Sequence, residues 1–197
     1  VPPAAFDRAD GRLLFETSFG KNVGGTYALL AGGHVYTGTE QMVAFDQQTK
    51  DLFATFPARK MIVTDQRFYM ATDAHLIAMD RQTKATLWKT PSTCADELIL
   101  AGDVLFAGGA DKVTAVETAT GKAAWFGTVE GAAKGLAVAS GRLLVSTDKG
   151  VIYSFAPQGP AQPATIDEPL RESPFADAPH GDLFARAAES ILKQTGI

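Results

Sequence analysis

Cysteine, surplus positive charge and long apolar runs are all scarce in this sequence. Its single cysteine, Cys94, excludes an intrachain disulfide and any zinc or haem motif built on cysteine pairs. Lysine and arginine number 18 against 22 aspartates and glutamates, so the net charge is −4 and no nucleic-acid surface is expected. No apolar run approaches the roughly 18 residues of a membrane span, and no signal peptide is recognised.

Sequence motifs of catalysis are missing as well. Neither a nucleophile elbow nor a phosphate-binding loop occurs, and the three histidines have no metal-ligand spacing: His34, His75 and His180. We therefore assign no catalytic, cofactor-binding or metal-binding residue. We expect Cys94 to be a buried or inert thiol.

What the sequence does contain is a repeat. Four segments share one pattern: residues 5–15, 44–54, 78–88 and 115–125. Each begins with Ala, any residue and an acid, continues after two residues with Thr or Asp and then Gly or Lys, and usually has an aromatic residue near its end. The acids are spaced by 39, 34 and 37 residues: Asp7, Asp46, Asp80 and Glu117. Four matches at near-constant spacing indicate a structural unit.

Each segment predicts a β-hairpin. The acid accepts hydrogen bonds from backbone N–H groups in the turn, which makes it a turn residue rather than a catalytic or calcium-binding one. Gly11 and Gly121 supply the positive φ of a bulged turn, and Lys50 and Lys84 replace that glycine. The returning strand ends in a large ring that fills space between stacked sheets: Phe15, Phe53, Trp88 or Trp125.

Two more strands precede each of the later hairpins. Four short antiparallel strands in about 35–40 residues are typical of a β-propeller blade. We therefore predict an all-β propeller of about four blades, and prefer it to a β-sandwich, which would not explain the repeat. The paired strands are expected at 27–30 and 34–38, 61–64 and 67–72, 97–100 and 104–107, and 136–138 and 142–147.

The motif Ala-x-Asp-x-x-Thr-Gly-x-x-x-Trp resembles the tryptophan-docking repeat of PQQ-like, quinoprotein-type propellers, and segments 115–125 and 78–88 match it best. The resemblance covers about residues 4–157. It departs at Lys50, Lys84 and Glu117, and the first two segments have Phe in place of Trp. The family includes quinoprotein alcohol dehydrogenases and BamB-type lipoproteins of outer-membrane assembly, so it implies the fold and a periplasmic or cell-envelope location.

The number of blades is unusual for this family. Three units are complete, residues 136–155 give three further strands, and residues 5–17 give a hairpin. An incomplete ring would leave strand edges and apolar faces uncovered. We favour a stretch of a longer propeller over a closed four-bladed ring, and a sequence that starts at Val1 agrees with this preference. In a third arrangement, a second chain completes the propeller.

The C-terminal part has a different composition. Six prolines between Pro157 and Pro179 predict an extended linker over residues 158–181. Residues 182–195 predict an amphipathic helix that begins at Asp182. We expect this helix either to pack on its own propeller or to begin another domain. In the second case the C-terminal part weakly resembles that of repeat proteins in which a short helix leads into a methyltransferase-like domain. Its apolar face is Leu183, Phe184, Ala187, Ala188, Ile191 and Leu192.

The preferred function is a non-catalytic binding or scaffold module with a protein partner and no cofactor. Its contacts are expected in the connections between blades, at residues 19–26, 57–60, 91–96 and 128–134. One alternative is a fragment of a PQQ-dependent dehydrogenase. In such dehydrogenases, as the resemblance implies, the quinone stacks on a tryptophan and in many cases on a vicinal disulfide. This chain has only one cysteine, and its Trp88 and Trp125 are expected between blades rather than at a quinone site, which speaks against this alternative. The other alternative is an accessory propeller domain of a larger enzyme.

Overall fold

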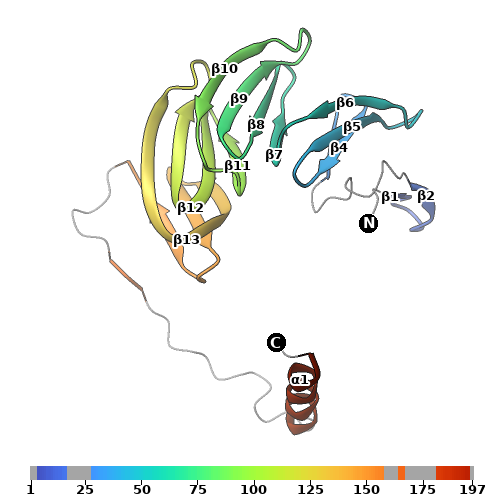
Figure 1. Cartoon of the computed structure of the whole chain (residues 1–197), viewed down its shortest axis with the longest axis vertical. Helices are drawn as coiled ribbons and strands as arrows, with labels where there is room; N and C mark the ends of the chain where they lie inside the picture. Colours follow the sequence, from blue (N-terminus) through green and yellow to red (C-terminus); the bar gives the residue numbers. More distant parts are fainter. Residues whose placement is uncertain (1–3, 17–27, 158–163, 167–180, 196–197) are drawn as a thin grey trace. The chain divides into compact units, whose positions relative to one another are not determined.

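The computed structural model describes residues 4–16, 28–157, 164–166 and 181–195 (Figure 1). The chain divides into two compact units, Val1–Gln158 and Gly159–Ile197, and each is described by itself. The first unit is built of antiparallel strands, and the second contains one helix. Both the all-β class and the C-terminal helix agree with the sequence prediction.

Two sheets of the first unit are complete four-stranded meanders, each with its strands in chain order. Blade 1 has β3 (Ala28–Ala31), β4 (His34–Gly38), β5 (Met42–Asp46) and β6 (Leu52–Phe56). Blade 2 has β7 (Lys60–Val63), β8 (Arg67–Ala71), β9 (His75–Asp80) and β10 (Thr86–Pro91). These sheets confirm the predicted blade.

The next two blades form one five-stranded sheet. Its strands are β11 (Glu97–Ala101), β12 (Val104–Glu117), β13 (Ala123–Ala139), β14 (Arg142–Thr147) and β15 (Ile152–Phe155). In β12, residues 104–108 pair with β11 and residues 110–116 with β13. In β13, residues 133–139 turn to β14 instead. We call β11, β12 and residues 123–132 blade 3, and residues 133–155 blade 4.

The separate strands expected within 104–117 and 123–138 are therefore continuous. In blade 2 the Thr72 hydroxyl accepts hydrogen bonds from the backbone N–H groups of Ala74 and His75, which forms a turn between β8 and β9. The repeat places Gly109 at that position, where no hydroxyl is available. The backbone bends instead at Asp111 (φ 58°) and Gly131 (φ 86°), whose N–H donates to the Asp111 carboxylate at 2.9 Å.

The core lies between neighbouring blades. Blades 1 and 2 share a cluster that includes Tyr36, Met42 and Phe68. Blades 2 and 3 share another with Leu76 and Leu105, and a third cluster joins blades 3 and 4. Because each fully buried large side chain contributes about 1.5–3 kcal/mol, these shared clusters hold successive blades together.

The remaining elements are short. β1 (Ala4–Phe6) and β2 (Leu13–Glu16) form a two-stranded antiparallel hairpin. In the second unit α1 spans Gly181–Thr195, one residue longer at its start than predicted, with Leu183, Phe184 and Ile191 exposed. In the described parts of the chain, no helix has the length and apolar character to span a membrane.

Candidate functional site: the grooves between neighbouring blades

The four acidic residues of the repeat occupy turns with the same backbone hydrogen bonds. In each turn the acid's N–H donates to the carbonyl five residues later, at 2.8–2.9 Å. Its own carbonyl accepts from the N–H four residues later, at 2.8–3.0 Å. The residue that donates this second bond has a positive φ in all four turns: Gly11 (73°), Lys50 (68°), Lys84 (61°) and Gly121 (69°).

The carboxylates face their own turns. Asp46 Oδ1 accepts hydrogen bonds from Gln48 N at 2.7 Å and Thr49 N at 2.9 Å. Asp80 Oδ1 accepts from Thr83 N at 2.7 Å and from the Thr83 hydroxyl at 2.9 Å. Bonds from Thr49 and Thr83 hold the pKa values of Asp46 and Asp80 below their usual range. These contacts stabilise the turns.

The other two acids vary this arrangement. Asp7 Oδ1 accepts one bond, from Ala9 N at 2.8 Å. The longer Glu117 side chain instead accepts a bond from the Thr120 hydroxyl at 2.8 Å.

The aromatic residues that end the hairpins lie on the corresponding turn of the next blade. Trp88 Nε1 donates to the Thr118 carbonyl at 2.8 Å, and a Cβ added at Gly121 would lie 2.6 Å from the Trp88 ring. One repeat earlier, Lys84 Nζ lies 4.7 Å from the centre of the Phe53 ring. Glycine therefore accompanies the larger indole and lysine the smaller phenyl ring. The side chain of Phe15 lies outside the described residues.

Trp125 is much more exposed than Trp88. Its side chain stacks edge-on against Phe155 of blade 4, with ring centres 5.0 Å apart. Trp125 is 37% exposed and Trp88 only 9%. Trp125 therefore lines an open surface at a repeat position where Trp88 is buried.

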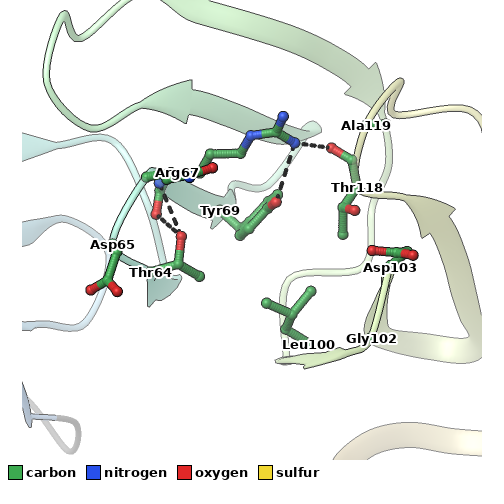
Figure 2. A pocket seen from close by; sticks show the side chains of 10 residues that line it. Thr64, Asp65, Arg67, Tyr69, Leu100, Gly102, Asp103, Thr118 and Ala119 are labelled. Atoms are coloured by element: carbon green, nitrogen blue, oxygen red, sulfur yellow. Dashed lines mark hydrogen bonds between the residues drawn. The ribbon is translucent and has the colours of Figure 1, made fainter.

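A polar groove of about 490 Å³ lies between blades 2 and 3 (Figure 2). Arg67 reaches from β8 across the boundary, and its Nη1 donates to the Thr118 carbonyl at 2.8 Å and to the Tyr69 hydroxyl at 3.5 Å. Thr118 O thus accepts from both Arg67 and Trp88. Asp65 and Asp103 also line this groove.

An apolar groove of about 510 Å³ lies at the equivalent position between blades 3 and 4. The repeat places Val104 where blade 2 has Arg67, Phe106 where it has Tyr69, and Ala156 where blade 3 has Thr118. These replacements remove the polar groups that cross the first groove. The groove is lined mainly by Val104, Phe106, Trp125, Val138, Leu143 and Phe155.

At the corresponding position between blades 1 and 2, the Arg81 side chain lies where the other two interfaces have a groove. There the repeat has Arg81 at the position of Thr118, and Arg81 Nη1 donates to the Thr64 carbonyl at 3.0 Å. The Arg81 guanidinium also approaches Gly32, where it occupies the space that a Cβ would need. Equivalent repeat positions therefore meet at all three interfaces, with different side chains at each.

Segments 57–60 and 91–96, expected to bind a partner, lie at the opposite ends of the strands from these grooves. Segment 128–134 was predicted as a connection, but it lies inside the continuous strand β13, around the bend at Gly131. Arg59 pairs with Asp73 at 2.8 Å, and Lys134 with Asp96 at 2.8 Å. Lys60 pairs with Glu97 at 3.5 Å, between the first residues of β7 and β11. Segments 57–60, 91–96 and 128–134 are thus tied to neighbouring elements, while segment 19–26 lies outside the described residues.

No group of three metal-ligating side chains occurs in the described ranges of the chain. Cys94 is buried in the cluster between blades 2 and 3, and this burial raises the pKa of its thiol. Since a thiolate is the reactive form, this environment suits a packing role.

Comparison with known proteins gives the same architecture. The family model described as outer membrane protein assembly factor BamB matches residues 4–132 and 95–160. BamB from Moraxella catarrhalis has a TM-score of 0.57 at 17% identity, covering 76% of this chain and 51% of that chain. This chain therefore spans about half the length of that BamB.

Two other solved structures are also similar. The computationally designed Ika4 protein has a TM-score of 0.61 at 13% identity, covering 71% of this chain and 95% of that chain. The Neurospora crassa Pan2 WD40 domain has a TM-score of 0.55 at 13% identity, covering 68% of this chain and 47% of that chain. No curated protein matches. At these identities the structural likeness shows the fold, a β-propeller.

Proposed function

Since the chain belongs to the family of the outer membrane protein assembly factor BamB, we propose that it is a non-catalytic β-propeller module that binds a protein partner. We further propose that it works in the cell envelope, as the name of that family suggests. The proposal concerns this chain, which spans about half of the Moraxella BamB.

The observation that carries the proposal is the fixing of the connections between blades. Backbone hydrogen bonds hold two of these segments: Arg59 N donates to the Ala71 carbonyl, Ser92 N to the Ala74 carbonyl and Asp96 N to the Gly108 carbonyl. The ion pairs of Arg59, Lys60 and Lys134 add a smaller contribution. A surface ordered before binding loses less conformational entropy when a partner docks. The segments still offer exposed side chains: Pro57, Arg59, Pro91, Thr93, Thr128, Glu130 and Lys134.

Propellers also support chemistry, so the protein-binding proposal needs a test that separates the two. A photoreactive amino acid placed at Arg59, Thr93 or Glu130 is irradiated in cells of the native host, and the captured proteins are identified. The matched controls carry the same group at Gln48 and Gln82, exposed residues of the acidic turns.

We expect one protein to be captured from the connection positions and not from the turn positions. Capture from the turn positions alone would contradict the proposal. So would alcohol oxidation by the purified chain after addition of PQQ and calcium, which would identify a dehydrogenase fragment instead.

A further inference from the structure

The apolar groove between blades 3 and 4 has the size of a small-molecule site. Its volume of about 510 Å³ lies within the range of about 300–1,000 Å³ that is usual for ligand pockets. Three aromatic rings line it, and Val138 adds an apolar side chain that is 42% exposed. Such walls remove apolar surface of a ligand from water, which favours binding.

Arg142 is the one ionisable residue among those that line the groove. Arg142 Nη1 donates to the Ser154 hydroxyl at 3.3 Å, and no acidic partner occurs for it in the described part of the chain. A guanidinium has five N–H donors in a planar fork that matches a carboxylate. We propose that this groove binds a small molecule with an apolar body and a single carboxylate, with the carboxylate at Arg142.

The polar groove between blades 2 and 3 is an internal comparison. There Arg67 Nη1 already donates to Thr118 and Tyr69, and the carboxylates of Asp65 and Asp103 line the same groove. Acidic side chains repel an anionic ligand and polar walls do not favour an apolar body. The selectivity for an amphipathic anion therefore belongs to the apolar groove. This inference is independent of the protein-binding proposal, because no residue that lines the groove belongs to segments 57–60, 91–96 or 128–134.

The test uses dodecanoate as the probe and isothermal titration of the whole chain as the measurement. Dodecyltrimethylammonium, which has the same chain and the opposite charge, is the matched control ligand. We expect dodecanoate to bind with one site per chain and about two- to fivefold more tightly than the cation, the ratio that one exposed ion pair supplies. A terminally brominated dodecanoate should quench the fluorescence of the exposed Trp125 and leave the fluorescence of the buried Trp88 unchanged.

Two pairs of variants locate the site. Arg142→Gln should weaken dodecanoate binding about two- to fivefold and abolish the preference over the cation. Lys149→Gln, at another exposed cation of blade 4, should change neither. Val138→Glu places a charge in the groove and should abolish binding. Its control is Ile152→Glu, a 73% exposed residue that does not line the groove. Far-UV circular dichroism of each variant establishes that it is folded.

Three results would overturn the proposal. The first is equal affinity for the two charged ligands, and the second is binding that survives Val138→Glu. The third is concentration-dependent self-association that buries Trp125, which would assign the groove to a second copy of the chain.

Discussion

The Trp88 indole nitrogen donates a hydrogen bond to the Thr118 carbonyl oxygen, 2.8 Å away, across the boundary between blades 2 and 3. Arg67 Nη1 donates to the same oxygen at 2.8 Å. A tryptophan at the end of one hairpin and an arginine at the start of another strand therefore meet on the next blade. Stability and groove shape both depend on this contact.

Loss of the Trp88 ring should cost more than loss of the Trp125 ring. Trp88→Ala should lower the free energy of unfolding by about 3–5 kcal/mol, because the ring is buried between two blades. Trp125→Ala should cost clearly less, since that ring is 37% exposed. Urea unfolding followed by circular dichroism measures both. Equal losses would mean that the two rings have equivalent environments.

The glycines of the turns should differ in their tolerance of a side chain. Gly11 and Gly121 both have positive φ, so alanine at either position costs about 1–2 kcal/mol in backbone strain. At Gly121 the new Cβ would also meet the Trp88 ring at 2.6 Å, whereas at Gly11 it would meet nothing within 4 Å. We therefore expect Gly121→Ala to lower the midpoint of thermal unfolding more than Gly11→Ala. The reverse order would contradict the contact with Trp88.

Contacts of the Lys84 side chain should offset part of the strain of its positive φ (61°). Lys84 Nζ donates to the Arg81 carbonyl at 2.9 Å and lies 4.6 Å from the centre of the Phe68 ring. Lys84→Met keeps the backbone strain and removes the charge, so it should lower the free energy of unfolding by about 0.5–1 kcal/mol, the usual contribution of a cation–π contact. Urea unfolding followed by circular dichroism measures this loss. An unchanged free energy of unfolding would show that the rings contribute nothing.

Acid should weaken the turns. The pKa values of Asp46 and Asp80 are lowered in the folded chain, so their contribution is present above the ordinary aspartate pKa of about 4. It is lost as pH falls through the lower folded values. The urea concentration at the unfolding midpoint should therefore decrease as the pH falls below about 4. This decrease should be smaller in Asp80→Asn than in the parent chain. An identical pH profile for the two would contradict the role of the carboxylate.

The repeat was sufficient to predict the blades. Spacing located the acids, and the turn that each acid would form follows from local hydrogen bonding within a few residues. The continuous strands β12 and β13 were not predicted, because the bend at Asp111 depends on Gly131, a residue 20 positions away.

The grooves were also not predicted from the sequence. They form where side chains of different repeats meet, and within a single repeat Arg67, Tyr69 and Arg142 are ordinary strand residues. The available signal was a change at equivalent positions: Arg67 becomes Val104 and Tyr69 becomes Phe106 one repeat later. Side-by-side comparison of the repeats would have found it.

The affinity of the captured partner tests the central claim, a protein-binding surface formed by the connections, most directly. The dissociation constant is measured for the parent chain, for a chain with Arg59, Thr93 and Glu130 replaced by alanine, and for a control with Gln48 and Gln82 replaced. We expect the first variant to bind at least about tenfold more weakly, a loss of about 1.4 kcal/mol, and the control to bind like the parent. Unchanged affinity in the first variant would contradict the claim.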